Sequence, residues 1–177
     1  MHPGKAIFRD PRKFWEATYS RDGLNQIVHR RKIAGLDLSP RRIGIAVSDD
    51  IQEFALPIGV FHVRRKGIHL ELQQPNKPLI QKMRCEANSI AGWVVGWPLT
   101  LAGEESYRTE ETLTIIEQCQ ILLGIQFENI LLHDERYSTI LARSDSLDQP
   151  KGHQVGLDAL AASRILQEYL DLSSRQH

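Results

Sequence analysis

The sequence has little that would mark a secreted or disulfide-stabilised protein. Among 177 residues it contains two cysteines, Cys85 and Cys119, whose spacing matches no metal-binding or redox motif. Both fall within segments of helical character, so we interpret them as buried thiols of a protein from a reducing compartment. We therefore expect a cytoplasmic location, with an organellar one as the alternative because the N-terminal segment is basic.

Long apolar runs and an excess of either charge are also missing. No run approaches the roughly 20 apolar residues that a membrane-spanning helix needs, so we expect no membrane partner. The chain has 22 lysines and arginines against 22 aspartates and glutamates, which gives a formal net charge of zero. This balance excludes nucleic-acid binding by bulk charge and leaves only local basic groups. Arg30-Arg31, Arg41-Arg42 and Arg64-Arg65-Lys66 are such groups, although solvated turn residues would look the same.

The composition that is present is typical of one globular domain. Hydrophobic residues make up 41% and charged residues 25%, and a chain of this length can bury a substantial core without disulfides. There are no internal repeats or low-complexity tracts. We predict an N-terminal arm over residues 1–31, with a short helix that packs its aromatic side chains on the domain. The domain itself is predicted over residues 32–172, followed by a tail over residues 173–177.

Hydrophobic patterns predict the element order β-β-β-α-β-α-β-α. The first two strands form a hairpin with a polar tip, and a third completes an antiparallel meander. Pro57 predicts an edge or a bulge near the start of that third strand. The order as a whole predicts an α/β fold with a mixed five-stranded sheet and helices on both faces. Predicted strands span residues 32–37, 43–48, 55–63, 92–97 and 130–133, and predicted helices span 79–88, 105–123 and 157–172.

Acidic residues follow two of the apolar strands. Asp37 ends the first strand, and Asp134 and Glu135 come at the end of the last one. A carboxylate there is costly if it is buried alone, which favours a site open to solvent or to a cation. Asp37 could equally cap the hairpin turn through local hydrogen bonds. Because neighbours in an extended segment point to opposite faces, only one of Asp134 and Glu135 can join Asp37 on a given side.

A third acid, Asp158, begins the last predicted helix. Helical spacing places it on one stripe with Ala161, Ala162, Ile165 and Tyr169. The two alanines would let this helix lie close against a sheet and bring Asp158 to the strand ends. The simpler alternative is an acid favoured by the positive end of the helix dipole.

Three acids placed in this way are suited to hard divalent cations. Mg²⁺ prefers oxygen ligands and keeps several waters, so two or three carboxylates plus substrate phosphate oxygens are sufficient. Two ions about 3.5–4 Å apart can activate a water and stabilise the leaving oxygen of an in-line displacement. We therefore predict two Mg²⁺ or Mn²⁺ ions as cofactors.

Four motifs follow one another in the chain: Gly35-Leu36-Asp37 with residues 42–49, then residues 94–99, then Asp134-Glu135-Arg136, then residues 157–162 with 165–170. Together they resemble the YqgF-type, RuvX-like nucleases over about residues 32–172. The resemblance implies an RNase H-like fold. Members are described as nucleases that process the 5′ end of pre-16S ribosomal RNA, and also as Holliday-junction resolvase-like. The family's three catalytic acids match Asp37, Glu135 and Asp158, and the choice of Glu135 over Asp134 rests on this resemblance.

The resemblance implies a metal-dependent endonuclease that acts on structured RNA such as pre-rRNA, or on branched DNA. The alternatives are a Holliday-junction resolvase-like DNA nuclease and a non-catalytic RNase H-like RNA-binding module. We expect a monomer or a homodimer, and junction cleavage would require a symmetric dimer with two sites. A phosphotransferase with an actin-like phosphate loop is least favoured, because the chain is too short for two lobes around a nucleotide.

Basic and histidine side chains near the acids complete the predicted site. Arg136, Arg41 and Arg42 are the predicted nucleic-acid contacts, since they should lie near the strand ends that carry the acids. The several donors of arginine suit phosphate oxygens. His133 and His153 are further candidates as proton donors, although a lone histidine is more often structural.

Overall fold

The computed structural model describes residues 6–21, 27–29, 31–66, 69–73, 77–134 and 156–174. Its strands are β1 (Ala6–Phe8), β2 (Ser20–Arg21), β3 (Ile27–His29), β4 (Lys32–Leu38), β5 (Arg42–Ser48), β6 (Ala55–Lys66), β7 (His69–Leu72), β8 (Ile90–Trp97) and β9 (Asn129–Asp134). Its helices are α1 (Pro11–Thr18), α2 (Lys77–Glu86), the 3-10 turn η1 (Ala87–Ser89), α3 (Tyr107–Leu123) and α5 (Leu157–Ser174). Among these helices, none is long and apolar enough to cross a membrane.

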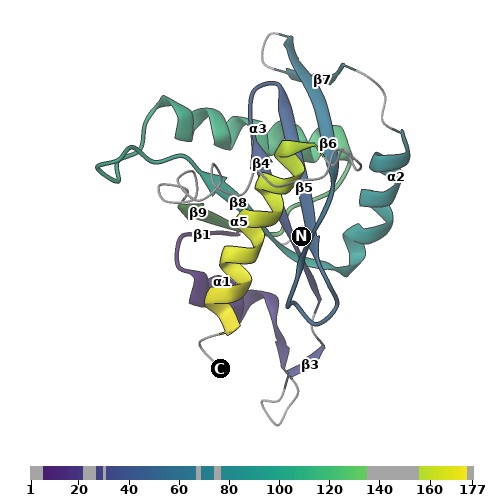
Figure 1. Ribbon diagram of the computed structural model, residues 1–177, viewed down its shortest axis with the longest axis vertical. Helices are drawn as coiled ribbons and strands as arrows, with labels where there is room; N and C mark the ends of the chain where they lie inside the picture. The colour runs from purple at the N-terminus through teal and green to yellow at the C-terminus, as the bar shows by residue number, and fades with distance from the viewer. Residues whose placement is uncertain are drawn as a thin grey trace, which may run out of the picture.

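A seven-stranded mixed sheet forms the centre of the described structure, in the order β1-β9-β8-β4-β5-β6-β7 (Figure 1). Strands β4 to β7 pair antiparallel, whereas β8 runs parallel to both β4 and β9, and β1 runs parallel to β9. The predicted α/β class with a mixed sheet is therefore confirmed. The predicted count of five strands is wrong, because β1 and β7 extend the sheet at its two edges.

The predicted irregularity at Pro57 is present as a bulge in β6. Ile45 pairs with Gly59, and the next residue, Ala46, pairs with Pro57. Ile58 is thus the extra residue, and a bulge of this kind accommodates a proline that cannot donate to the ladder.

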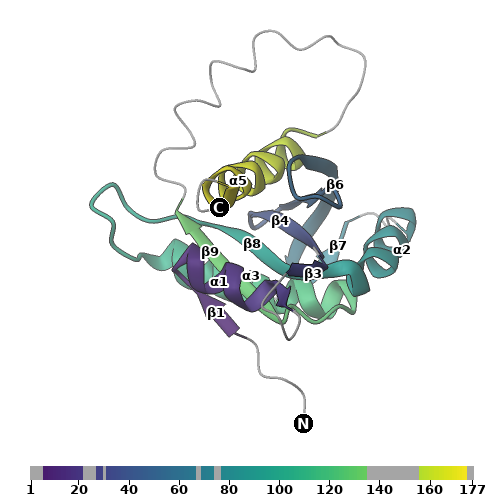
Figure 2. The same ribbon diagram turned by 90° about the horizontal axis from the view of Figure 1, so that it is seen from below.

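Helices cover both faces of the sheet (Figure 2). On one face, α2 and α3 cover a core of large side chains, which includes Phe61, Met83, Trp93, Trp97, Ile116, Phe127 and Leu132. On the other face, α5 and α1 cover a smaller core, which includes Phe14, Ala46, Val94, Leu131, Ala162, Leu166 and Tyr169. These two sides of the sheet are the α2/α3 face and the α5 face.

The N-terminal segment packs on the α5 face, as expected from its aromatic residues. Asp10 caps α1 and Pro11 occupies its first turn, a favourable start for a helix. Phe14 is fully buried and lies edge-on to Tyr169 of α5, with ring centroids 5.2 Å apart. Because β1 also joins the sheet, this segment contributes to the core, and the domain boundary at residue 31 stays a prediction.

One cysteine differs from the prediction. Cys119 on α3 is buried, as expected, but Cys85 on α2 is exposed. The short α2 buries only Leu79 and Met83, and Cys85 lies off that stripe.

Candidate active site

The β4–β5 hairpin presents Asp37 at the edge of the sheet. Asp37 pairs across the ladder with Gly44 and is half-buried. The turn beside it is closed by Ser39, whose hydroxyl accepts from the Arg42 N–H at 3.0 Å and donates to the Arg42 carbonyl at 2.9 Å. Ser39 therefore does the capping that was considered for Asp37, and the Asp37 carboxylate is not used in closing the turn.

Helix α5 lies in direct contact with this hairpin because two strand glycines leave room for its backbone. A Cβ on Gly44 would lie 1.9 Å from the Asp158 carbonyl oxygen, and one on Gly35 would lie 2.7 Å from the Ala162 carbonyl oxygen. No other residue fits such gaps. The first turn of α5 is thereby seated on β5, next to the strand that carries Asp37.

The buried stripe of α5 is rotated slightly from the prediction. Ala162, Ile165 and Tyr169 are buried as predicted, but Ala161 is only half-buried, and Ala159 takes its place with no exposed surface. This rotation places the helix backbone at Asp158, Ala159 and Ala162 against Gly44 and Gly35. Asp158 itself stays near the sheet with a side-chain exposure of 17%.

The charge of Asp158 acts on Asp37. Burial, and next the negative charge of Asp158, raise the pKa of Asp37 to about 6, while Arg42 acts to lower it. Arg42 pairs with Asp158 through Nη1 at 3.3 Å, and half of the Arg42 side chain remains exposed. The predicted convergence of Asp37, Asp158 and Arg42 is therefore present in the structure.

Strand register brings β8 and β9 to the same edge. Leu36, the residue before Asp37, pairs with Val95, and further along β8 Gly96 pairs with His133. Because these strands are parallel, their carboxyl ends lie together, a common position for sites in α/β proteins. The end of β9 thus lies two strands away from Asp37.

Helix α5 crosses the strands and connects the two sides of this edge. It begins over Gly44 on β5, and ten residues later Glu168 contacts His133 Nε2 on β9 at 2.9 Å. Ten helical residues rise about 15 Å, close to the three strand spacings between β5 and β9. The His133–Glu168 contact therefore fixes the end of β9 relative to α5.

The alternation of faces along β9 shows on which side of the sheet Asp134 lies. Leu132 packs in the core under α3, and Asp134, two residues on, lies on that same face. Asp37 follows Leu36 of the same core and so lies on the opposite, α5 face. Asp134 is therefore not placed to join Asp37. Glu135, Arg136 and His153 lie outside the described residues.

The remaining predicted contact, Arg41, is exposed at the hairpin tip. Its carbonyl accepts from the Val63 N–H at 2.9 Å, which ties the tip to β6. Arg41 and Arg42 thus stand at the edge that carries the acids, as predicted, and their contact with nucleic acid stays a prediction.

Sequence reasoning missed the residues that support the acids rather than the acids themselves. Gly35 and Gly44 determine how close α5 comes, and Ser39 and Glu168 hold the turn and the end of β9. A glycine inside an otherwise apolar strand is a usable signal, because it often marks a close backbone approach. Glu168 offered none, as its partner is 35 residues away.

Residues 31–172 match the sequence profile of the family described as "RuvX: Holliday junction resolvase". The chain belongs to the RuvX family. A "Putative pre-16S rRNA nuclease" from Salinibacter ruber is 33% identical over 155 residues, 84% of this chain and 98% of that one. A protein of the same name from Protochlamydia amoebophila is 32% identical over 146 residues, 79% of this chain and 93% of that one. Membership in this nuclease family makes the chain a hydrolase of phosphodiester bonds.

Among solved structures, a Thermus thermophilus RuvC in complex with a Holliday-junction substrate aligns with a TM-score of 0.38 and 13% identity, over 81% of this chain and 96% of that one. The RuvX assignment does not depend on this distant similarity.

Proposed function

We propose that this RuvX-family protein is a divalent-metal-dependent endonuclease that cleaves structured RNA of the pre-16S type. Asp37, Asp158 and Glu135 are its proposed metal-binding and catalytic acids. The observation that carries the proposal is the contact of α5 with Gly44, which brings Asp158 beside the half-buried Asp37 at an open sheet edge.

The two described acids fit a hard cation. Burial and mutual repulsion raise the pKa of Asp37 to about 6, which a cation at these carboxylates would counteract. Carboxylate oxygens are the ligands that Mg²⁺ and Mn²⁺ prefer. Within the described ranges no cluster of three candidate ligands occurs, and the proposed third ligand, Glu135, lies outside them. When bound, a divalent ion at this site supplies an activated water and stabilises charge on phosphate oxygens.

The protein's own residues have separate proposed roles. Asp37 lies on a strand whose turn is closed by Ser39, so its backbone is held in place beside Gly44. Asp158 lies in the first turn of α5, at the positive end of the helix dipole. Arg42 pairs with Asp158, and its exposed half, with the exposed Arg41, is placed to contact a substrate phosphate. Arg136, which lies outside the described residues, is the third proposed contact.

The placement of Asp134 supports Glu135 as the third acid. Asp134 lies on the α2/α3 face with Leu132, whereas both described acids of the site belong to the α5 side. The next residue in the chain is the one that the family motif assigns, and it follows a strand whose end is tied to α5 by His133 and Glu168.

RNA is the proposed substrate because the relatives from Salinibacter ruber and Protochlamydia amoebophila are named for pre-16S rRNA. A DNA junction is the second candidate, since the family description names a Holliday junction resolvase. A resolvase needs two sites in a symmetric dimer, so a monomer in solution would count against it. The cytoplasmic location and the oligomeric state stay predictions.

One experiment separates these functions. The purified protein is incubated with a pre-16S RNA fragment that includes the 5′ end, and with a four-way DNA junction, each with Mg²⁺, Mn²⁺ or chelator. We expect RNA cleavage that requires the metal and is lost in Asp37→Asn, Glu135→Gln and Asp158→Asn. Asp171→Asn, which changes an exposed acid at the far end of α5, is the matched control and should cleave normally.

The other outcomes are equally informative. Preferential cleavage of the four-way junction would indicate that the substrate is branched DNA rather than RNA. Cleavage that survives Asp37→Asn would overturn the assigned acids. Binding of RNA without cleavage, unaffected by the three substitutions, would indicate a non-catalytic RNA-binding module.

A further inference from the structure

Large apolar side chains are exposed in the segment that joins β8 to α3. In the part of the chain that the structure describes, the most exposed large hydrophobic residues are Leu101 at 92%, Leu157 at 74%, and Tyr107 and Ile121 at 72% each. Leu157 precedes Asp158, and Leu101 and Tyr107 follow β8 at the same carboxyl edge. Ile121 alone lies at the far end of α3. Leu101 and Tyr107 thus belong to one segment, which begins at the carboxyl end of β8 and leads into α3.

The segment between β8 and α3 is held by its own bonds. The Gly103 N–H donates to the Thr100 carbonyl at 2.8 Å, and the Glu104 N–H donates to the Thr100 hydroxyl at 3.1 Å. Gly103 has a φ of +83°, which the turn requires. Arg9, next to β1, forms an ion pair with Glu105. Leu101 is therefore presented to solvent by a defined turn.

Tyr107 is fixed at the first position of α3. Ser106 caps the helix, and Thr109 completes a capping box with it. The buried side of α3 is formed by other residues, beginning with Thr109 and Thr112, so the Tyr107 ring has no packing role in the core. Arg108 Nε donates to the Tyr107 phenol oxygen at 3.4 Å, which keeps a guanidinium group beside the ring.

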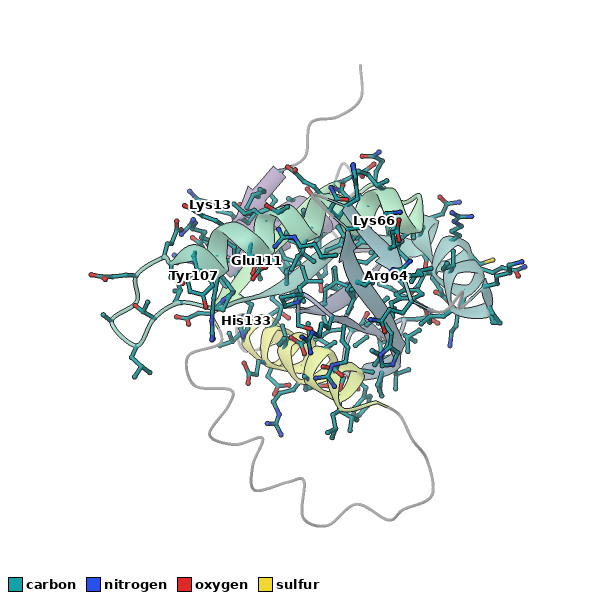
Figure 3. All side chains as sticks on the ribbon, turned by 90° about the horizontal axis from the view of Figure 1, so that it is seen from above. Lys13, Arg64, Lys66, Tyr107, Glu111 and His133 are labelled. Carbon is teal, nitrogen blue, oxygen red and sulfur yellow. The ribbon has the colours of Figure 1, made fainter. Side chains whose placement is uncertain are left out.

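We propose that Tyr107, supported by Leu101, is a stacking surface for unpaired bases of an RNA strand that enters the active site. Figure 3, which looks down on this edge, shows Tyr107 and Glu111 on α3, with His133 nearer to α5. This inference rests on the proposed nuclease function and specifies its substrate, because base faces are accessible in single strands and hidden in a duplex.

The local charges favour base contact over phosphate contact at Tyr107. Glu104 and Glu110 are exposed on either side of it in the sequence and would repel a phosphate. Bases carry no charge at neutral pH, so they can approach the ring while the phosphates face the basic groups. Over the described ranges, neither Arg41 nor Arg108 has a carboxylate at ion-pair distance, so both guanidinium groups are available to the backbone of the strand.

The test measures binding in the Asp37→Asn background, so that the RNA stays intact. The probes are a fluorescein-labelled single-stranded RNA oligonucleotide and a blunt RNA duplex of the same length, followed by fluorescence anisotropy without divalent cations. Tyr107→Ala should weaken single-strand binding about tenfold, whereas Tyr107→Phe should keep it. Duplex binding should change less than about twofold. Ile121→Ala, a substitution at an equally exposed residue on the same helix, is the matched control and should change neither.

Salt dependence separates stacking from charge. Tyr107→Ala should lower affinity without changing the slope of log affinity against log salt, while Arg108→Ala should reduce that slope by about one phosphate contact. Unchanged single-strand binding in Tyr107→Ala, an equal loss on the duplex, or an equal loss in Ile121→Ala would each refute the stacking surface.

The outcome is independent of the nuclease assignment. Binding is measured without hydrolysis, so a chain that fails to cleave RNA can still show the loss in Tyr107→Ala. Conversely, cleavage that survives Asp37→Asn would overturn the catalytic acids and leave the binding result standing. Circular dichroism of each variant, together with the retained binding of Tyr107→Phe, separates a local effect from misfolding.

Discussion

The two faces of the sheet are packed by different means. On the α2/α3 face, large rings such as Trp93 and Phe127 stack with centroids 3.9 Å apart and fill the space between sheet and helix. On the α5 face, Gly35 and Gly44 let the helix backbone touch the strands. Large side chains stabilise the α2/α3 face, whereas the close approach of α5 places Asp158 on the other face. Packing on the α5 face therefore determines where Asp158 lies. Substitutions on this face should affect activity beyond their effect on stability.

Gly44→Ala should have the largest effect. Its new Cβ would meet the Asp158 carbonyl at 1.9 Å, and because the contact is with backbone, α5 must move. We expect a loss of about 4 kcal/mol or more in the free energy of unfolding. We also expect loss of cleavage in the molecules that still fold, measured as activity per folded fraction. Gly59→Ala is the control, since its Cβ would meet only the ends of the flexible Leu79 side chain, at 3.0 and 3.2 Å.

Phe127→Ala should be nearly as destabilising but leave the site intact. The Phe127 side chain is 1% exposed, and removal of such a ring costs about 3–4 kcal/mol. Urea unfolding should show this loss, while kcat measured well below the transition should stay within about twofold of the parent. A large fall in kcat for the folded variant would mean that both faces position the acids.

Asp37→Asn should stabilise the protein when divalent cations are absent. The pKa of Asp37 is higher in the folded state than its usual 3.8, so ionisation destabilises the fold as pH rises from about 4 to about 6. The gain over the parent should be absent at about pH 4 and reach at most about 3 kcal/mol near pH 8. Thermal unfolding at both pH values measures it. Mg²⁺ should raise the Tm of the parent but not of Asp37→Asn, and equal shifts would remove Asp37 from the metal site.

Glu168→Ala should have the smallest effect on stability among these four changes. The Glu168 carboxylate is about one-third exposed, so losing its bond to His133 should cost about 1 kcal/mol. Because the bond holds the end of β9 against α5, we expect a higher Mg²⁺ concentration for half-maximal cleavage, with recovery in Glu168→Gln. Glu117→Gln, an exposed acid on α3, is the control and should leave the Mg²⁺ requirement unchanged.

The elements that carry the site were predictable because their patterns are local. The strands of the β4–β5 hairpin and β8 are nearly continuous apolar runs, and α5 shows a helical period. Strands β1 and β7 were missed, since segments of three and four residues hold no usable period. The meeting of Asp37 and Asp158 could be predicted from their positions at element ends. The rotation of α5 that buries Ala159 instead of Ala161 could not be predicted, because it depends on contacts with the strands.

The pairing of β1 with β9 has a consequence for the order of folding. Ala6 pairs with Asn129, so the first described strand finds its partner only after more than a hundred further residues have been made. Contacts so distant in the chain close slowly and late. During synthesis, the core around Phe14 therefore stays incomplete until β9 and then α5 have been made. The proposed active site combines β4 with α5, so it can form only after α5 has been synthesised, and a product truncated before α5 would lack Asp158.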